Sequence, residues 1–476
     1  MDKKNDAITS RDVDFAKWYT DVCRKAELMD YSPVKGFINY LPYGYGIWEA
    51  IKAFADPLFK EKGAENVYLP MVIPMSMFNK EKDHVEGFAP EILVATVGGG
   101  NELADPLVIR PTSEILFSDL YKRLVKSYRD LPKRFNQWCS VVRWEKTTRP
   151  FLRGSEFLWQ EGHCLFETEK EANDNALEML EVYDRIGREC LAIPFLKGKK
   201  SKHETFAGAV ATYAIEALMH DGKALQAGTS HYLGQGFAKA AGISFLGRNN
   251  TLETPYQSSW GISTRLVGAV IMVHGDDNGL VLPPMVAPSQ VVIVGIRVND
   301  EKVQAACKDV YERLKKLGIR VKLDIDPSKT PGWKFAEYEM KGIPLRLEIG
   351  PRDLEKGEAS LSIRFSGEKR TVKLDDLEKL LPELLKEIQE GMYQAAKKRL
   401  EASIVDVETL DELKAALDKG GYARMAYCGE EECELKIKEL TNGGTARCIY
   451  KEGVEGKTCP ICGKPATIIA YFAKAY

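Results

Sequence analysis

The stretch SVVRWEKTTRPFLRGSEFLWQEGH, residues 140–163, indicates the fold more strongly than any other part of the chain. It predicts two antiparallel strands, 135–145 and 154–166, joined by a loop rich in Thr, Arg and Pro. Successive side chains of a strand point to opposite faces, so alternate residues share one face. On such a platform Arg143 can bind a phosphate or a carboxylate through two nitrogens. Taken alone, the pattern also suits an ordinary hairpin with surface ion pairs.

The segments around this hairpin alternate between helical and strand patterns. The apolar spacing of Ile47, Ile51, Phe54 and Leu58 predicts a helix over 46–62. A buried strand is predicted at 67–72. A helix over 112–128 would open at Pro111 with a threonine cap. A long amphipathic helix is expected over 169–189, and an apolar helix followed by a strand within 268–283.

Pro283, Pro284 and Pro288 mark a boundary, beyond which strands and helices alternate regularly. Strands are predicted at 291–296, 321–324, 344–349 and 361–364, and helices at 303–317, 334–341 and 374–400. The last unit begins near residue 405. We therefore expect a multidomain protein that combines α+β and α/β folds, divided at 1–285, 286–402 and 403–476.

Composition narrows the class of protein. The chain has 476 residues with 67 Lys and Arg against 69 Asp and Glu, a net charge of -2, and 44% of its residues are hydrophobic. This excludes a largely disordered chain and a globally basic nucleic-acid coat, but not a local basic surface. No run approaches the ~20 apolar residues of a membrane span. The N-terminus has no apolar core of a signal peptide, so a cytoplasmic protein without membrane contact is expected.

The hairpin resembles motif 2 of class II aminoacyl-tRNA synthetases, and two further motifs follow that family's order. Residues 63–70 (GAENVYLP) resemble motif 1, whose proline, here Pro70, lies at a homodimer interface in the family. Residues 261–265 (GISTR) resemble motif 3. The chain is most similar to the prolyl-tRNA synthetase family, through the strings RPTSE (110–114), FLWQEGH (157–163), QAGTSH (226–231), MVHGDD (272–277) and GLVLPP (279–284).

The resemblance implies a ligase that forms an aminoacyl-adenylate from proline and ATP and then charges tRNA(Pro). It implies an antiparallel-sheet catalytic domain, an α/β anticodon-binding domain and a small zinc-binding α+β domain. Catalysis then depends on positioning and on charge neutralisation at phosphorus. The implied catalytic residues are Arg143, Arg265 and Glu145, of which Arg143 is central and bridges the α-phosphate and the proline carboxylate. The implied ATP-site residues are these three, with Glu145 on the adenine amino group, together with Arg153, Ser263, Thr229, and Gln226 near a Mg²⁺ ion.

The proline pocket implied by the resemblance has a polar and an aromatic part. Thr112 and Glu114 would receive the secondary amine, with Ser263 nearby. Trp159, His163, Phe206 and His231 would wall the ring. The alternatives are a helix N-terminal cap for Thr112 and Glu114, and core packing for each aromatic residue. His84, His203 and His220 are expected to be surface or structural residues, and the basic segment 197–202 either touches tRNA or is a solvated loop.

The resemblance also assigns residues to the second and third units. Phe335 would stack on an anticodon base, while Glu339 and Arg346 would read guanine edges. The alternative is an ordinary amphipathic helix and strand. In the family the last tyrosine, here Tyr476, packs back toward the active site, although a tail docked elsewhere is also possible.

Five of the ten cysteines lie between residues 428 and 462. Two close pairs in an expected cytosolic protein favour a tetrahedral thiolate zinc site over disulfides. The family's zinc module favours the ligands Cys428, Cys433, Cys459 and Cys462. Because the second pair is spaced Cys-x2-Cys, a set that includes Cys448 stays open.

Gly162 and Gly261 are only 99 positions apart, which leaves no room for the editing domain that bacterial-type prolyl enzymes carry there. The layout resembles the archaeal and eukaryotic type. The alternatives are a threonyl, histidyl or glycyl enzyme of the same subgroup, activation of cysteine as a second substrate, and a non-catalytic paralogue that binds tRNA or protein. Loss of Arg143 or Arg265 would have indicated such a paralogue, and both are present.

Overall fold

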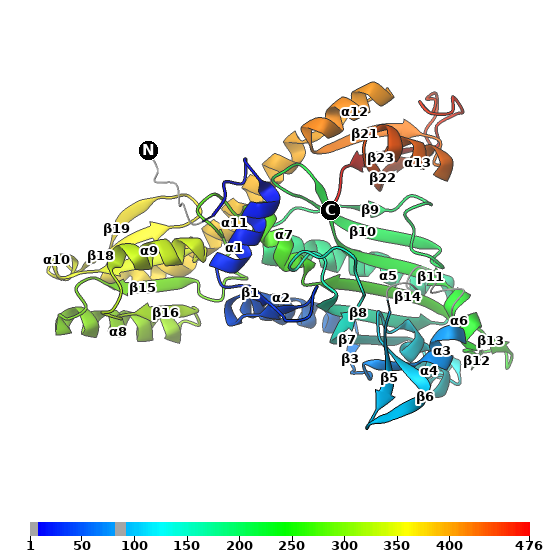
Figure 1. Ribbon diagram of the computed structural model, residues 1–476, viewed down its shortest axis with the longest axis horizontal. Helices are drawn as coiled ribbons and strands as arrows, with labels where there is room; N and C mark the ends of the chain where they lie inside the picture. The colour runs from blue at the N-terminus through cyan, green and yellow to red at the C-terminus, as the bar shows by residue number, and fades with distance from the viewer. Residues whose placement is uncertain (1–7, 81–91) are drawn as a thin grey trace.

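The computed structural model describes residues 8–80 and 92–476, which form three units, each with its own sheet (Figure 1). The largest sheet has the order β3-β7-β8-β14-β11-β10-β9. Its neighbouring strands are antiparallel, except that β3 and β7 are parallel. The strands are β3 (Glu65–Asn66), β7 (Lys133–Val142), β8 (Glu156–Phe166), β9 (Leu196–Lys199), β10 (Ala211–Leu218), β11 (Ala224–Gly234) and β14 (Tyr256–Ser263). The predicted antiparallel core is confirmed.

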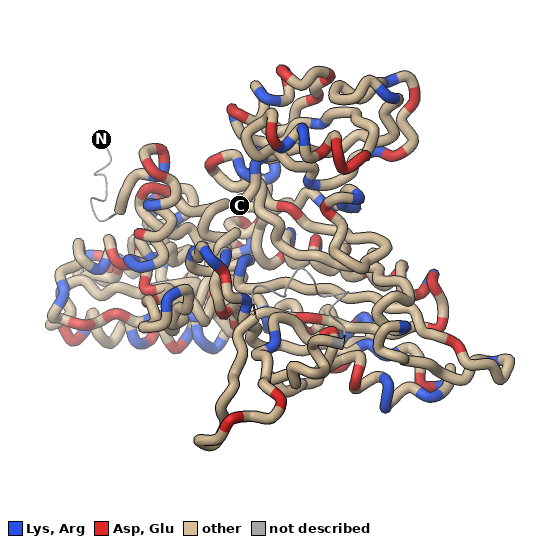
Figure 2. Tube along the Cα trace, turned by 45° about the vertical axis from the view of Figure 1, so that its right-hand side comes forward, with Lys and Arg blue, Asp and Glu red and all other residues tan. Residues whose placement is uncertain are grey.

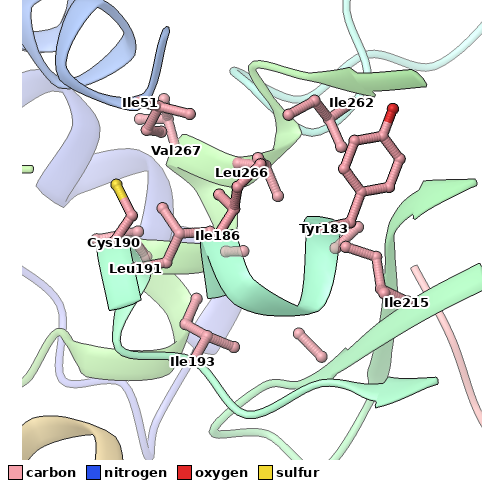
Figure 3. Close-up of a cluster of buried hydrophobic side chains, with 14 of the residues drawn as sticks. Ile51, Tyr183, Ile186, Cys190, Leu191, Ile193, Ile215, Ile262, Leu266 and Val267 are labelled. Atoms are coloured by element: carbon pink, nitrogen blue, oxygen red, sulfur yellow. The ribbon is translucent and has the colours of Figure 1, made fainter. Parts of the chain in front are cut away.

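One face of this sheet is covered by helices. Helix α5 (Glu169–Arg185) packs across β10, β11 and β14, with α2 (Pro42–Glu61) and α7 (Arg265–His274) beside it. Ser230 Oγ donates to the Ala176 carbonyl, and Ser258 Oγ to Asn175 Oδ1, so both serines face α5. A π-helical turn (Ile186–Leu191) extends α5, and its apolar side chains meet those of α2, α7 and the strands (Figure 3).

The alternation along the strands therefore assigns a different set of residues to the opposite face. Ser258 pairs with Cys164 and Tyr232, so the neighbouring row, His163, Ser259 and His231, points away from α5. That open face carries the candidate site.

Smaller elements frame the core sheet. They are α1 (Phe15–Lys25), the pair β1 (Met29–Tyr31) and β2 (Ile38–Tyr40), the sheet β4 (Val72–Pro74), β6 (Asn101–Ile109) and β5 (Leu93–Gly98), α3 (Met75–Lys80), α4 (Glu114–Leu124), α6 (Gly236–Ala241), and the pair β12 (Phe245–Leu246) and β13 (Leu252–Glu253).

The second unit has the sheet order β16-β15-β17-β18-β19, parallel over its first three strands and antiparallel beyond. Arg364 binds both carboxylate oxygens of Asp276 at 2.6 and 2.7 Å and so ties this unit to the core. Its elements are β15 (Val291–Gly295), α8 (Glu301–Lys316), β16 (Val321–Asp324), α9 (Pro331–Met340), β17 (Leu345–Ile349), α10 (Pro351–Leu354), β18 (Glu358–Ile363), β19 (Lys369–Lys373) and α11 (Leu377–Ala402).

The C-terminal unit packs against the β9 and β10 edge of the core sheet. Its sheet order is β20-β21-β23-β22. Its elements are β20 (Ile404–Asp406), α12 (Leu410–Lys419), β21 (Tyr422–Tyr427), α13 (Glu431–Leu440), β22 (Thr445–Glu452) and β23 (Ile468–Ala473). Basic and acidic residue positions alternate along the chain trace of all three units, in keeping with the near-zero net charge (Figure 2).

Three of the predicted elements differ from the structure. The strand at 67–72 is wrong, because Arg110 donates to the carbonyls of Leu69 and Pro70 where a partner strand would, and Pro70 has no N–H to offer a ladder. The helix at 112–128 spans only α4. The strand expected after α7 is absent from the described residues, although Leu280 N donates to the Met340 carbonyl.

Candidate active site

A cavity of about 680 Å³ lies on the open face of β8, β14 and β11. Cross-strand register explains how distant parts of the chain meet there. Ser263 pairs with Trp159, while Gly261 pairs with both Glu161 and Thr229. Most of the predicted catalytic and pocket residues line the cavity: Glu114, Arg143, Trp159, His163, Gln226, Thr229, His231, Ser263 and Arg265.

The other predicted residues lie beside the cavity. Thr112 Oγ1 donates to Glu114, and the Phe206 ring centroid is 4.9 Å from that of His231. Arg153 Nη1 is 3.6 Å from Glu145 Oε2. Arg153 also lines a second cavity of about 830 Å³, together with Arg265. The structure thus brings all of the predicted ATP and amino-acid residues into one region.

Three guanidinium groups, those of Arg143, Arg153 and Arg265, lie in this region. Arg143 Nε donates to the Pro111 carbonyl at 3.0 Å, and its guanidinium lies over the Trp159 ring. Arg265 donates to the carbonyls of Leu152 (3.0 Å) and Gln226 (3.1 Å). Burial, with Arg153 and Arg143 nearby, lowers the pKa of Arg265 to about 10. Such a cluster is suited to an anionic ligand, such as a polyphosphate or a carboxylate.

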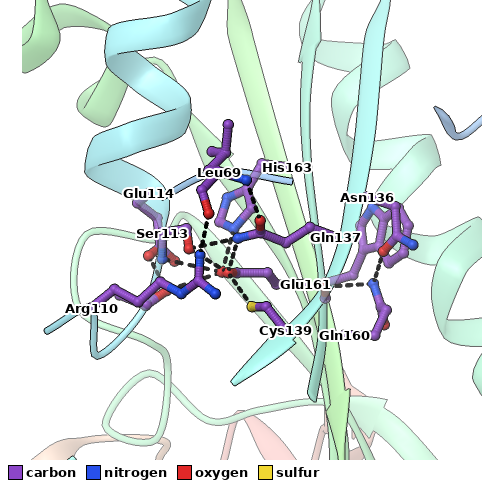
Figure 4. Close-up of polar contacts among 12 residues, drawn as sticks. Leu69, Arg110, Ser113, Glu114, Asn136, Gln137, Cys139, Gln160, Glu161 and His163 are labelled. Atoms are coloured by element: carbon purple, nitrogen blue, oxygen red, sulfur yellow. Dashed lines mark hydrogen bonds and ion pairs between the residues drawn. The ribbon is translucent and has the colours of Figure 1, made fainter. Parts of the chain in front are cut away.

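Glu161, to which no role was predicted from the sequence, organises the polar contacts on the Glu114 and His163 side of the cavity. Ser113 and Gln137 donate to Glu161 Oε1, and His163 Nε2 lies 2.9 Å from its Oε2 (Figure 4). Only 2% of Glu161 is exposed. Burial opposes ionisation, but the hydrogen bonds from His163, Ser113 and Gln137 prevail and lower its pKa to about 2. The sequence feature that could have indicated this role is the position of Glu161 between Trp159 and His163, since alternate residues of a strand share one face.

The pKa values of the two histidines of the cavity are shifted in opposite directions. Burial disfavours the cation of His163, yet its pKa is raised, because it bonds to Glu161 and faces the charge of Glu114. Burial lowers the pKa of His231 to about 3, and the His163 cation adds to this shift. At neutral pH His231 is therefore an uncharged wall of the cavity, and its Nδ1 lies 2.9 Å from Thr212 Oγ1.

The cap proposed as an alternative for Thr112 and Glu114 is not observed. The N-cap of α4 is Ser113, which makes no side-chain cap hydrogen bond, and its hydroxyl serves Glu161 instead. Glu114 opens the helix and faces the cavity.

The C-terminal tail reaches the second cavity. Tyr476 N donates to the Ala224 carbonyl at 3.0 Å, and its hydroxyl donates to Asp221 at 2.6 Å. The side chains of Arg149 and Lys223 lie over its ring. Tyr476 is therefore docked beside the candidate active site and not elsewhere.

The three predicted anticodon residues also lie together. Phe335, Glu339 and Arg346 line a cavity of about 670 Å³ on the second unit. The Arg346 guanidinium lies 4.2 Å from the Phe335 ring centroid, and its Nε donates to Glu348 at 3.0 Å.

The ligand atoms of Cys428, Cys433, Cys459 and Cys462 lie within 4.8 Å of one another. Cys428 Sγ and Cys462 Sγ are 3.8 Å apart, and tetrahedral ligation at a Zn–S distance of about 2.3 Å requires about 3.8 Å. The donor set therefore fits zinc. Cys448 is buried elsewhere, against the Ala214 carbonyl, so the ligand set that includes it is wrong.

The basic segment 197–202 is only partly a surface feature. Lys197 pairs with Glu181 and Asp184, whereas Lys200 is buried and its Nζ lies 3.3 Å from Glu216. Lys200 is therefore neither exposed for a tRNA contact nor part of a solvated loop.

His84 lies outside the described residues. Over those residues, no helix is long and apolar enough to cross a membrane.

Comparisons with known proteins agree with this geometry. Residues 96–274 match the family model "tRNA synthetase class II core domain (G, H, P, S and T)", 290–384 match "Anticodon binding domain", and 410–476 match "Prolyl-tRNA synthetase, C-terminal". The core sheet, with the segments 140–163 and 261–265 that resemble motifs 2 and 3, thus has the class II aminoacyl-tRNA synthetase fold.

The similarity to prolyl enzymes extends over the whole chain. It is 53% identical to a proline–tRNA ligase of Acetoanaerobium sticklandii, covering 98% of both chains. It is 54% identical to a proline–tRNA ligase of Lachnospira eligens, covering 99% of this chain and 98% of the relative. A crystal structure of Cryptosporidium parvum prolyl-tRNA synthetase, complexed with halofuginone and AMPPNP, matches with a TM-score of 0.95 at 39% identity over 99% of each chain. The chain belongs to the prolyl-tRNA synthetase family.

Proposed function

We propose that the protein attaches L-proline to tRNA(Pro) in two ATP-dependent steps. The observation that carries this is the placing of Arg143, Glu114 and the aromatic wall in one cavity of a chain whose relatives match it from end to end. A carboxylate oxygen of proline attacks the α-phosphorus of ATP, and the bond to the β-phosphate oxygen breaks, releasing pyrophosphate. The terminal ribose hydroxyl of tRNA then attacks the prolyl carbonyl carbon and releases AMP.

Each residue predicted for the ATP site has a proposed part in the first step. Arg143 would hold the α-phosphate and the proline carboxylate together, and Arg265 and Arg153 would bind the rest of ATP. Glu145 would accept from the adenine amino group, while Thr229 and Ser263 would make polar contacts. The Gln226 side chain would lie near Mg²⁺, which takes oxygen ligands and neutralises phosphate charge.

The amino-acid pocket would match both ends of proline. Glu114, supported by Thr112, would receive the cationic secondary amine. Trp159, His163, Phe206 and His231 would surround the ring; His231 is uncharged at neutral pH and so does not repel the cation. A zinc ion on the four cysteine thiolates would stabilise the fold of the C-terminal unit.

We also propose the unit boundaries 1–285, 286–402 and 403–476, a cytoplasmic location and a homodimer formed through motif 1. The exposed side chains of Tyr68, within the motif-1 segment 63–70, and of Met71, directly after it, support the last of these.

The test of the function is ATP–pyrophosphate exchange with each of the twenty amino acids, followed by charging of tRNA(Pro). Exchange should require proline. Exchange with threonine, histidine or glycine but not proline would favour the other enzymes of the subgroup. Comparable exchange with cysteine would establish a second substrate.

Replacing Phe335 by Ala is expected to weaken charging without affecting exchange. A base stacked on an aromatic ring contributes about 1–3 kcal/mol, so the KM for tRNA should rise about 5- to 150-fold. Exchange needs no tRNA and should stay within twofold of the wild-type rate. Lys308→Ala, on the exposed side of α8, is the control. An unchanged KM for tRNA would refute the assignment.

We expect no hydrolysis of alanyl-tRNA by the purified protein. A pocket built for proline rejects a smaller side chain by only a few kcal/mol, so some alanine should be activated. The segment between β8 and β14 belongs to the core sheet and its cover, which leaves no separate site for correction. Deacylation of alanyl-tRNA well above the uncatalysed rate would contradict this.

A further inference from the structure

The loop between β9 and β10 forms part of the wall of the amino-acid pocket. Within this loop, the Phe206 N–H donates to Thr212 Oγ1 of β10 at 2.9 Å. The same oxygen lies 2.9 Å from His231 Nδ1, and the Phe206 ring lies against the His231 ring. The position of this part of the loop, residues 200–206, therefore sets the position of Phe206, which packs on His231 of β11.

The C-terminal unit holds this loop at two points. Ser201 Oγ donates to Glu434 Oε1 at 2.7 Å, and His203 Nδ1 lies 3.0 Å from Glu431 Oε1. Ser201 in turn shapes the loop, because its hydroxyl accepts from Glu204 N and its carbonyl accepts from Thr205 Oγ1. Glu434 is 2% exposed, so its hydrogen bond to Ser201 is shielded from water.

These holding groups are next to the cysteine ligands in the chain. Glu431 and Glu434 flank Cys433 in the first turn of α13. Tyr427, whose hydroxyl also donates to Glu434 at 3.1 Å, immediately precedes Cys428. Ligation of the two cysteines would fix the backbone that carries the holding groups.

A separate contact docks the C-terminal unit as a whole. Arg447 of β22 binds Glu216 of β10 through contacts of 2.9–3.2 Å, and Lys200 Nζ binds the same carboxylate at 3.3 Å. All three residues are buried. Removing Glu434 should therefore release the 201–206 part of the loop while the unit stays attached.

We propose that the cysteine cluster acts at a distance on amino-acid binding, with Glu434 as the positioning residue that connects α13 to the loop and to the Phe206–His231 wall. This goes beyond a structural role for the metal. It rests on the proposed function in taking the cavity as the amino-acid site.

The first test compares Glu434→Ala, Glu434→Gln and Glu432→Ala in ATP–pyrophosphate exchange. Small misplacements of binding groups can cost one to two orders of magnitude, so the KM for proline should rise about tenfold in Glu434→Ala. The KM for ATP and the zinc content should stay within twofold of wild type. Glu434→Gln keeps an acceptor for Ser201, so its KM for proline should stay close to the wild-type value. Glu432 is exposed in the same turn, so Glu432→Ala should leave both KM values unchanged.

An unchanged KM for proline in Glu434→Ala would overturn the proposal, as would equal increases in both KM values. If that variant does not fold, Ser201→Ala removes the same hydrogen bond from the loop side and should show the same split between the two KM values. A Ser201→Ala protein with the wild-type KM for proline would equally overturn it.

The second test needs no activity, and so separates this proposal from the proposed function. Hydrogen–deuterium exchange is followed in the full chain before and after zinc is removed by a chelator. Amides of 201–206 should exchange at least about tenfold faster without zinc, while those of β7 and β8 stay protected. Unchanged exchange in 201–206 would refute the coupling even if proline is the substrate. Faster exchange would support it whichever amino acid is activated.

Discussion

Replacing Arg143 by Ala is expected to lower proline-dependent ATP–pyrophosphate exchange by about 10³-fold. A single donor directed at developing charge contributes about 10²–10³ in rate, and Arg143 would serve both reacting groups. Its Nε is held by the Pro111 carbonyl and its guanidinium rests on Trp159, so its geometry is set before substrate binds. The measurement is kcat/KM for exchange, alongside the melting temperature.

Two further variants make this result specific. Arg143→Lys keeps the charge but loses the planar pair of donors, and should recover less than about tenfold of the lost activity. Arg248→Ala removes an exposed guanidinium that binds Glu167, and should exchange at the wild-type rate. An Arg143→Ala protein within threefold of wild type would show that the proposed mechanism is wrong.

Local sequence patterns predicted the strands that carry the site. The strands β7 and β8 lie where 135–145 and 154–166 were expected, because alternating apolar residues report directly on a half-buried strand. The strand expected at 67–72 failed for a non-local reason. Its hydrogen-bond partner is the side chain of Arg110, which lies 40 residues away, and a pattern within the segment cannot show that.

The site itself was predicted through motif order and not through spacing. Arg143 follows β7, Gln226 lies on β11 and Arg265 follows β14. They share a cavity because β7, β8, β14 and β11 are neighbours in one sheet, although these strands are far apart in sequence. Glu161 and Lys200 were missed for the opposite reason. Each reads as an ordinary charged residue, and only burial against distant partners shows its role.

Glu161→Gln is expected to destabilise the protein by about 3 kcal/mol at pH 6, because it removes one partner of a buried ionic pair with His163. For a folded unit of the size of the first one, a destabilisation of this size corresponds to a fall of about 8 °C in melting temperature. The KM for proline should also rise, since the amide keeps only one acceptor oxygen for the donors Ser113, Gln137 and His163, and Ser113 lies next to Glu114. Glu49→Gln, at an exposed position on α2, should change neither quantity.

The pH dependence of this difference distinguishes a lost charge from a packing defect. The pKa of Glu161 is lowered to about 2, so its stabilisation is present above its ordinary pKa of 4.5 and is lost as the pH falls toward 2. The pKa of His163 is raised, so its stabilisation is present below 6.5 and is lost as the pH rises through the higher folded value. The gap in melting temperature between wild type and Glu161→Gln should therefore be widest near pH 5–6.5 and narrow on both sides. A gap that stays constant from pH 4 to pH 9 would mean that shape, and not the ionic pair, accounts for the loss.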